Sequence, residues 1–523
     1  MSRAGSDDLI SVLLSGGARG DRSCYAFIPA GTASATASIS YADLLDRAHR
    51  AATGLRALGV QDGDRVALVA RPDVGYVVTM AAALLAGGVA APINHQFKQR
   101  ELSAYCGVVE PAVVLTDATT DATVARVHSG PRITLDEVPG VASLAELERC
   151  EPAAPAVVRP TDTAFLLHTS GTTGLPKAVV RSHETYARFV HLWADRYMAP
   201  DDDVLSFMPM YHQGGVMMSF LPTYLRGRTT YQLERFSVPT FWSAARHHQT
   251  SWAVFMPPVP SFVRLHPELD PVHPFEWAMT GGRVDHWLEM QDRFGIVGHS
   301  GYGSTETTMV TMTGDRVDGP AGGNDVHGPL GGFACGHPIA GWNSLRVVRD
   351  DGSPAAPLEV GHLELSGPGV ITEYFGRSTP PRRDGVWFRP GDVAYLDEVG
   401  RLFMVDRAND LIRRSGENIS PREIEEVLQD HPAVDEAAVV PVEDEVRGQE
   451  IRACVVLRDG WTVTPDDLFR HCEEQLSAFK VPRFLEVRDA LPHTPTMKIR
   501  KDVLVAEPPD QGWVDRFAGR GAG

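Results

Sequence analysis

One segment of the chain combines small hydroxyl residues, glycines and a lysine directly after an apolar run. Its nine residues, TSGTTGLPK, occupy Thr169–Lys177 and follow the apolar stretch Ala164–Leu167. Small residues let backbone N–H groups come close to a polyphosphate, hydroxyls add donors, and the lysine adds a positive charge. The Walker loop requires Ser or Thr directly after Gly-Lys, whereas here Pro176 precedes the lysine and Ala178 follows it. The pattern predicts a phosphate-binding loop of another type, with a plain hydroxyl-rich turn between strands as the alternative.

This loop resembles the phosphate-binding signature of the adenylate-forming superfamily, and further segments resemble other signatures of that family in the same order. The superfamily includes acyl- and aryl-CoA synthetases, peptide-synthetase adenylation domains and beetle luciferases. The resemblance covers roughly Ser40 to Lys501, nearly the whole chain. The further segments are Val179–His183 (VVRSH), Pro209–His212 (PMYH), Thr280–Gly282 (TGG), Gly301–Glu306 (GYGSTE), Trp387–Asp392 (WFRPGD), Asp406–Arg407 and Leu491–Ile499 (LPHTPTMKI).

The resemblance assigns most of these segments to ATP. The ring of Tyr302 offers a face for adenine, the Thr305 hydroxyl a contact to the α-phosphate, and Glu306 a hard oxygen ligand for Mg²⁺. A carboxylate can accept both ribose hydroxyls, which is the role implied for Asp392, while Arg407 meets ribose or phosphate oxygens. Taken singly, the last two residues would be interpreted as solvated surface groups. The implied nucleotide-binding residues are Thr169, Ser170, Gly171, Thr172, Thr173, Gly174, Lys177, Gly281, Gly282, Tyr302, Gly303, Ser304, Asp392 and Arg407.

A lysine near the end of the chain corresponds to the family's mobile catalytic lysine. In the family this residue comes from the small C-terminal domain and bridges the substrate carboxylate and the α-phosphate, and Lys498 matches it. A placed ammonium and Mg²⁺ would stabilise the charge that builds on the α-phosphoryl oxygens, and no covalent enzyme intermediate is required. The catalytic residues implied by the resemblance are Lys498, Thr305, Glu306 and His212, with Glu306 also the metal ligand.

The PMYH segment resembles the aromatic–histidine segment that lines the family's acyl pocket. Amino-acid-activating relatives place an aspartate near Arg235–Ser237, where this chain offers Ser237, so an amino acid substrate is disfavoured. The remaining pocket candidates are mostly apolar, which favours a medium or bulky apolar carboxylic acid. These candidates are His212, Gly214, Gly215, Met217, Met256, Gly281, Tyr302 and Met309.

The second half-reaction of the family passes the acyl group to a thiol after the small domain rotates about a hinge. Asn409 occupies the hinge position, and Arg414–Asn418 resembles the loop that meets pantetheine, with Gly416 at its centre. These matches favour CoA as the acceptor. The alternative is adenylation alone, with handover to an acyl carrier protein or a separate enzyme. A luciferase-like oxygenase ranks well below both, because nothing in the sequence signals one. A nucleotide-binding regulator without enzymatic activity comes last, because the implied catalytic residues are intact.

Length and composition bound these interpretations. The 523 residues are enough for two or more domains, and the formal charge of −18 argues against binding nucleic acid or anionic lipid. Six cysteines without a CxxC pair predict free thiols in a reducing, cytoplasmic compartment. The apolar run Tyr76–Ile93 is broken by Gly87-Gly88, so it predicts a core helix and a strand rather than a membrane segment.

The elements that must position these motifs follow an alternating pattern. Ser40 and Asp43 predict a capped helix that ends at Gly59. A strand over Val66–Ala70, a helix over Asp73–Ala86 and a strand over Val89–Ile93 follow, and such βαβ units imply parallel sheets covered by helices. From about Val360 the pattern changes to short strands and turns.

After Arg407 a compact α+β pattern begins, with a helix from Ser420, strands near Ala437–Val442 and Ile451–Leu457, and a helix over Pro465–Leu476. The expected fold is therefore α/β, with a large multi-subdomain N-terminal domain that has parallel-rich sheets and a small barrel-like part. A small, mobile α+β domain completes it. We expect residues 1–406 to bind AMP and the acyl group, and residues 407–523 to form the mobile lid that carries the catalytic lysine.

Overall fold

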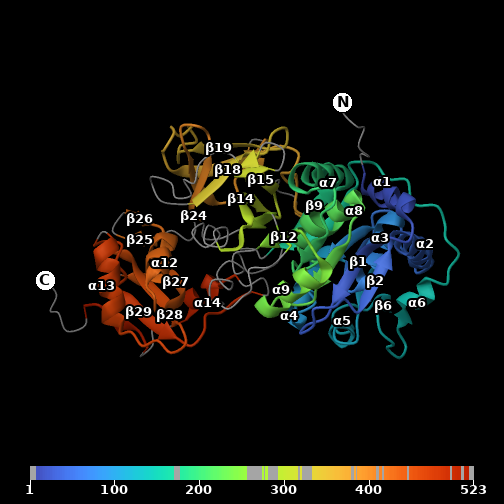
Figure 1. The fold of residues 1–523 in the computed structure, drawn as a ribbon, viewed down its shortest axis with the longest axis horizontal. Coiled ribbons are helices and arrows are strands. Elements are labelled where there is room, and N and C mark those ends of the chain that lie inside the picture. The colour runs from blue at the N-terminus through green and yellow to red at the C-terminus, as the bar shows by residue number, and fades with distance from the viewer. Residues whose placement is uncertain are drawn as a thin grey trace. The chain divides into compact units, whose positions relative to one another are not determined.

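The computed structural model describes residues 8–169, 177–255, 274–275, 277–280, 293–315, 319–320, 333–377, 382–383, 386–407, 412–414, 417–444, 447–476, 478–494, 498–507 and 512–517. The chain forms two compact units: residues 1–324, 335–345 and 365–388 make the first, and residues 325–334, 346–364 and 389–523 make the second. The expected α/β fold with a large N-terminal part and a smaller α+β C-terminal part is confirmed (Figure 1). The division between residues 406 and 407 stays a prediction.

The first sheet of the large unit is parallel up to its last pair of strands. Strand–helix–strand units build it, because short apolar strands that are buried on both faces need helices to cover them. The predicted strand, helix and strand after residue 65 are confirmed as β3, α3 (Val74–Leu85) and β4. Its strands, in spatial order, are β7 (Ala142–Ser143), β6 (Arg132–Thr134), β5 (Val113–Thr116), β3 (Arg65–Leu68), β4 (Val89–Pro92), β8 (Thr163–Thr169) and β9 (Lys177–Ser182).

The second sheet of the large unit is parallel from β1 to β14, and antiparallel strands flank that parallel part. The first nine strands in the spatial order of this sheet are β2 (Ala37–Ser40), β1 (Ser23–Ile28), β11 (Thr230–Leu233), β10 (Val204–Ser206), β12 (Trp252–Phe255), β13 (Trp277–Thr280), β14 (Val297–Ser304), β15 (Thr308–Met312) and β18 (Phe333–Pro338). Short pairs outside this run are β16 (Gly314–Asp315) with β17 (Gly319–Pro320), and β21 (Arg382–Arg383) with β22 (Trp387–Phe388).

Helices pack on these sheets. The Ser40 hydroxyl accepts a hydrogen bond from the Asp43 N–H at 3.0 Å, so the predicted cap of α2 is confirmed, and α2 packs against α3 (Figure 1). The helices of this unit are α1 (Leu9–Leu14), η1 (Ser15–Arg19), α2 (Tyr41–Ala57), α3, α4 (Gln99–Val109), α5 (Asp121–Val124), α6 (Leu144–Leu147), α7 (His183–Tyr197), the π-helix η2 (Gly214–Phe220), α8 (Leu221–Arg226) and α9 (Val238–His248).

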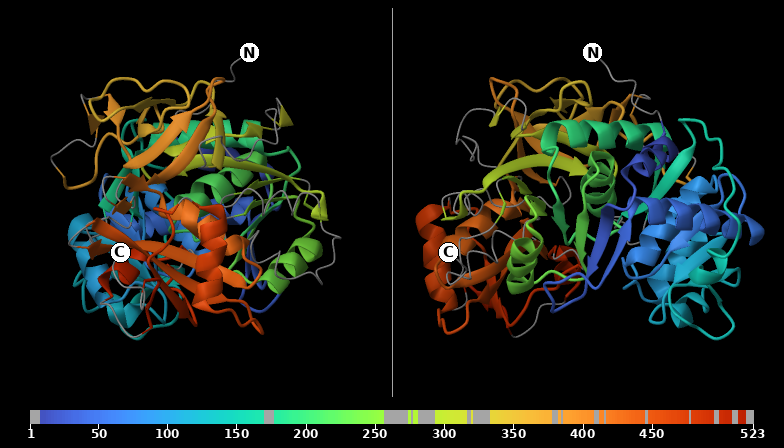
Figure 2. Two further views of the ribbon diagram at one scale, coloured as in Figure 1. Left: turned by 90° about the vertical axis from the view of Figure 1, so that its left-hand side faces the viewer. Right: turned by 45° about the vertical axis from the view of Figure 1, so that its right-hand side comes forward.

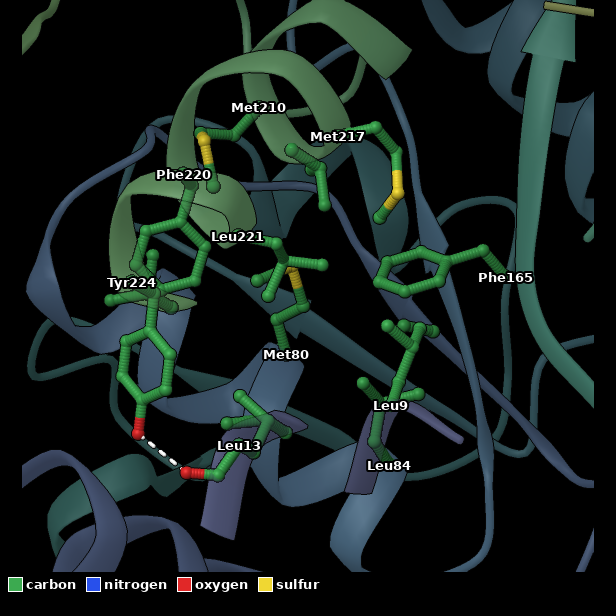
Figure 3. Close-up of a cluster of buried hydrophobic side chains, with 14 of the residues drawn as sticks. Leu9, Leu13, Met80, Leu84, Phe165, Met210, Met217, Phe220, Leu221 and Tyr224 are labelled. Carbon is green, nitrogen blue, oxygen red and sulfur yellow. Dashed lines mark hydrogen bonds between the residues drawn. The ribbon is translucent and has the colours of Figure 1, made fainter. Parts of the chain in front are cut away.

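The main hydrophobic core lies where α1, α3, β8, η2 and α8 meet. Figure 3 shows Leu9 and Leu84 close to Phe165, with Met217 above them. The Tyr224 hydroxyl donates to the Leu13 carbonyl at 2.7 Å, so the one polar tip among these side chains is satisfied (Figure 3). Burial of this kind is the main driving force for folding of the unit.

The second unit begins with antiparallel strands and ends in a separate α+β body, which Figure 2 shows in orange and red. The antiparallel strands are β20 (Gly361–Ser366), β23 (Asp392–Leu396) and β24 (Leu402–Arg407), and β19 (Ser344–Val348) pairs with β20. The α+β body consists of β25 (Ile412–Arg414), β26 (Glu417–Ile419), α12 (Pro421–Asp430), β27 (Val434–Asp444), β28 (Gly448–Leu457), α13 (Pro465–Gln475), β29 (Phe484–Arg488), α14 (Lys501–Ala506) and β30 (Val514–Asp515). The helices and strands predicted after residue 407 are confirmed, although β27 and β28 extend further than expected.

The C-terminal body has its own core and its own buried charges. Leu468 of α13 is fully buried in its hydrophobic cluster. Arg414 and Glu450, both nearly inaccessible to solvent, form a two-bond ion pair at 2.7 and 3.1 Å. At one edge of the sheet, β30 pairs with β29 and is held by an ion pair of Arg483 and Asp515 at 3.2 Å.

The structure also bears on membrane-spanning helices and on the state of the cysteines. None of the helices that the structure describes is both long enough and apolar enough to span a membrane. All six cysteines lie within the described residues, and each is a free thiol.

Candidate active site

The predicted phosphate-binding loop joins two neighbouring antiparallel strands. Thr169 ends β8, Lys177 begins β9, and the two residues are direct partners in the ladder. The loop between them, which contains Ser170, Gly171, Thr172, Thr173 and Gly174, lies outside the described residues. The residues at the two ends of the loop are therefore neighbours in the sheet, and both are half-buried.

The GYGSTE segment forms the end of β14 and the turn into β15. Its glycines are required by close backbone packing: a Cβ on Gly301 would clash with the Thr311 carbonyl oxygen, and one on Gly303 would clash with the Thr308 carbonyl oxygen. The residues Tyr302, Ser304, Thr305 and Glu306 are partly exposed, and Gly303 is exposed. The segment therefore presents its side chains to solvent above a buried hairpin.

Buried polar contacts fix the residues that follow this turn. Thr308 has a positive φ of 54°, a conformation that costs free energy for a β-branched residue. Its hydroxyl accepts from the Trp342 indole N–H at 2.9 Å, and Asn343 donates to the Thr307 carbonyl at 3.1 Å. The Gly369 N–H in turn donates to the Asn343 side chain at 3.0 Å. A strained backbone persists only where its surroundings determine it, and this network does so.

Tyr374 connects the turn to the start of β9. Its hydroxyl donates to Glu306 Oε1 at 3.1 Å, and the Lys177 ammonium lies 5.1 Å from the centre of its ring. The backbone supports this arrangement, because the Ile371 N–H donates to the Glu306 carbonyl at 2.8 Å and Tyr374 bridges to Val179 of β9. Tyr374 therefore contacts both the last residue of the predicted phosphate loop and the predicted metal ligand, and the sequence motifs did not indicate this tyrosine.

The PMYH segment is also joined to the turn. Gln213, which is 5% exposed, donates from Nε2 to the Ser304 carbonyl at 3.2 Å. Its neighbour His212 is half-buried, and its Nδ1 accepts from the Gly214 N–H at 3.1 Å. Gln213 was not among the expected site residues, since an amide beside a known motif carries no distinguishing signal.

A group of aromatic rings and imidazoles lies beside His212. The rings of His168 and Tyr211 stack with centroids 5.6 Å apart, and His95 meets Tyr211 edge-on at 6.0 Å. Burial lowers the pKa of His168 to about 3, with a smaller contribution from His212, and burial lowers the pKa of His212 to about 4. Both imidazoles are therefore neutral at physiological pH, and this wall carries no positive charge from them.

Some acyl-pocket candidates have packing roles. A Cβ on Gly214 would meet the Met208 side chain, and one on Gly215 would lie 2.8 Å from the Met208 carbonyl oxygen. These glycines therefore let η2 approach the preceding segment. Met217 is fully buried in the main core, and Met309 is 5% exposed in the same cluster. Met256 lies outside the described residues.

The remaining predicted residues belong to the second unit or lie outside the described residues. Asp392 is 6% exposed on β23 and is the ladder partner of Arg407 on β24. Lys498 is exposed, and its N–H donates to the Thr494 hydroxyl at 3.0 Å, while the Thr494 N–H donates to the Lys498 carbonyl at 2.8 Å. These two hydrogen bonds with Thr494 fix the backbone of Lys498, and the residue is exposed. Gly281, Gly282, the predicted hinge Asn409 and the pantetheine-loop Gly416 lie outside the described residues.

Comparison with known proteins identifies the architecture. The family model "AMP-binding enzyme" matches residues 17–375, and the model "AMP-binding enzyme C-terminal domain" matches residues 423–498. Feruloyl-CoA synthase of an Amycolatopsis species is 31% identical over 474 residues, which cover 89% of this chain and 93% of that protein. Crotonobetaine/carnitine–CoA ligase of Escherichia coli is 29% identical over 491 residues, covering 88% and 92%.

A solved structure supports the same conclusion. ATP-bound MatB from Rhodopseudomonas palustris superimposes with a TM-score of 0.84 at 27% identity, over 95% of this chain and 98% of that one. The chain therefore belongs to the AMP-binding enzyme family, as its motifs suggested.

Proposed function

We propose that this protein activates a carboxylic acid with ATP and transfers the acyl group to the thiol of CoA. In the first step a carboxylate oxygen attacks the α-phosphorus of ATP, the bond to the β-phosphate oxygen breaks, and pyrophosphate leaves. In the second step the CoA sulfur attacks the carbonyl carbon and AMP leaves. Relatives named as CoA ligases at about 30% identity over nearly the full chain support this reaction.

The observation that carries the proposal is the contact of Tyr374 with both Glu306 and Lys177. A lysine at the end of the proposed phosphate-binding loop and a carboxylate therefore contact the same side chain within one unit. A triphosphate with a bound divalent cation needs both charges, because the lysine contacts phosphate and the carboxylate contacts the metal. Thr305 and Tyr302 lie on the same partly exposed segment, where they would meet the α-phosphate and adenine.

The donor set fits Mg²⁺ bound with ATP rather than a metal held by protein alone. No group of three His, Cys, Asp or Glu side chains within the described residues could hold a metal ion. Mg²⁺ is commonly bound through one or two carboxylates together with substrate phosphates, and Glu306 supplies such a carboxylate. Tyr374 holds one of its oxygens and so orients the other. When bound, Mg²⁺ would offset the negative charge of the phosphates.

We propose an apolar or aromatic acid without a second carboxylate. The rings of His95, His168 and Tyr211 support this class, because they are aromatic and the His168 imidazole is neutral. The names of the relatives do not decide the acid, since they include feruloyl, oxalate, carnitine and long-chain fatty acid enzymes. The free thiols support a reducing compartment, and we propose the cytoplasm.

The test is AMP release from ATP and Mg²⁺ over a panel of aromatic, straight-chain and dicarboxylic acids, each with and without CoA. We expect acyl-CoA and AMP with an aromatic or apolar acid when CoA is present. Lys498→Ala should lower adenylate formation by a factor of about 100 or more, since it removes a charge placed for the transition state. Its exposed position predicts an unchanged fold by circular dichroism.

Two results would contradict the proposal. Hydroxamate trapped from an adenylate without CoA, combined with no thioester when CoA is added, would require a different acceptor. ATP consumption that no acid stimulates would exclude acid activation.

A further inference from the structure

A buried arginine lies directly behind the proposed ATP site. Arg181 is on β9, four residues after Lys177, and is 1% exposed. Its neighbour on the same strand, Val179, is fully buried and apolar. An apolar side chain at such a position would cost no desolvation of charge, whereas a buried guanidinium is costly unless it is paired. The presence of a charge here therefore needs a reason.

The guanidinium joins two segments of the site that are distant in sequence. Arg181 donates from Nη2 to the Thr305 carbonyl and from Nη1 to the Gly369 carbonyl at 2.7 Å. Its charge also lies 5.7 Å from the centre of the Tyr186 ring. Thr305 precedes the proposed metal ligand, and Gly369 belongs to the segment that leads to Tyr374. One side chain, that of Arg181, therefore holds both the residue before Glu306 and the segment whose Tyr374 donates to the Glu306 carboxylate.

The charge environment agrees with this arrangement. Burial lowers the pKa of Arg181, while Tyr186 and Glu306 act in the opposite direction. Arginine nevertheless stays protonated in proteins, so the group supplies a permanent positive charge. This fixed cation attracts the Thr305 and Gly369 carbonyl oxygens.

We propose that Arg181 is a positioning residue for adenylation: it holds the Thr305 carbonyl, and thereby the Thr305 hydroxyl and the Glu306 carboxylate, in place for ATP and Mg²⁺. This inference rests on the proposed function. A displacement of about 1 Å at such groups is enough to slow a reaction by a factor of about 100. Arg181 itself need not touch ATP to have this effect.

Calorimetric titration of ATP into the full-length protein, in Mg²⁺ and in EDTA, tests the inference independently of turnover. Arg181→Met removes the charge and both donors at similar length. We expect it to weaken ATP binding at least tenfold in Mg²⁺ and much less in EDTA, because Glu306 acts only through the metal. Arg181→Lys keeps the charge but reaches one carbonyl, so its effect should be smaller in the same direction. Adenylation should fall in kcat, with the KM for the acid unchanged.

The control is Arg452→Met. Arg452 is also 1% exposed and donates to the Leu504 carbonyl at 2.9 Å, but it forms ion pairs with Glu486 and Glu507 and belongs to the C-terminal body. Its loss should leave the Mg²⁺ dependence of ATP binding unchanged. Equal weakening in Mg²⁺ and EDTA, the same change in the control, or wild-type binding in folded Arg181 variants would overturn the inference.

Two further outcomes are also decisive. If Arg181→Met does not fold, a folded Arg181→Lys protein with wild-type affinity and Mg²⁺ dependence would overturn the inference by itself. If the wild-type protein binds ATP but no acid stimulates ATP use, the proposed function fails, while the titration still decides the role of Arg181.

Discussion

At the scale of single residues, the site depends on side chains kept in one protonation state. His168 lies against Tyr211, and the Asn94 N–H donates to its Nε2 at 3.2 Å, so a neutral imidazole is required as acceptor. Since burial lowers its pKa to about 3, the folded protein resists adding a proton that the unfolded chain accepts near pH 6.5. The buried His168 therefore lowers the free energy of unfolding when the pH falls below about 6.5.

His168→Gln tests this dependence. The stability that the neutral histidine provides is fully present above about pH 6.5, and it is lost as the pH falls from there toward 3, because only the unfolded state gains the proton. Gln can accept a hydrogen bond but does not titrate. Urea unfolding between pH 8 and pH 4.5 should show a shallower loss of stability in the variant. The difference at pH 8 gives the cost that is independent of pH, and parallel curves would contradict the assignment.

Motif residues could be predicted from the sequence, but the residues that connect them could not. Lys177, Glu306 and Lys498 lie in motifs whose residues are contiguous in the sequence. Gln213, Tyr374 and Arg181 act through contacts between residues 91, 68 and 188 positions apart, and no local pattern records such a contact. Arg181 lies in the VVRSH segment, but the sequence alone does not show that its side chain is buried.

At the scale of elements, the fold was predictable where periodicity and caps are strong. Helix α3 and strands β3 and β4 lie within one or two residues of their expected ranges. The π-helix η2 was not predicted from the sequence, where Gly214 and Gly215 were only acyl-pocket candidates. In the structure Gly215 packs closely against the Met208 carbonyl, and Gly214 lies against the Met208 side chain. π-Helical turns are rare and often lie at functional sites, which fits the position of η2 directly after His212.

Substitution of two glycines by alanine separates packing from propensity. Gly215→Ala would push a Cβ against the Pro209 and Met208 carbonyls and should lower the free energy of unfolding by about 1–3 kcal/mol. Gly107→Ala, at an exposed position of helix α4 with no atom near its Cβ, should raise it by about 0.5–1 kcal/mol. Thermal unfolding of both variants measures this. A tolerated alanine at position 215 would show that η2 can shift.

At the scale of the whole molecule, two compact units with separate hydrophobic clusters predict separable unfolding. Leu468→Ala removes a fully buried side chain from the C-terminal cluster and should destabilise it by about 2–5 kcal/mol. Calorimetry should show one transition moving down by several degrees and the other unchanged. Leu84→Ala, in the core of the large unit, should move the other transition. A single transition that moves in both variants would show that the units unfold together.

The short strand β30 has a consequence for the behaviour of the protein in a cell. An uncovered strand edge presents unpaired N–H and C=O groups to other chains and promotes aggregation. Residues 512–517 place β30 along β29, with Asp515 bound to Arg483 and Trp513 against Arg452. A shortened protein that ends at residue 507 would keep every proposed catalytic group and yet expose this edge. Loss of β30 would therefore make the protein insoluble during expression without changing the catalytic activity of the molecules that stay in solution.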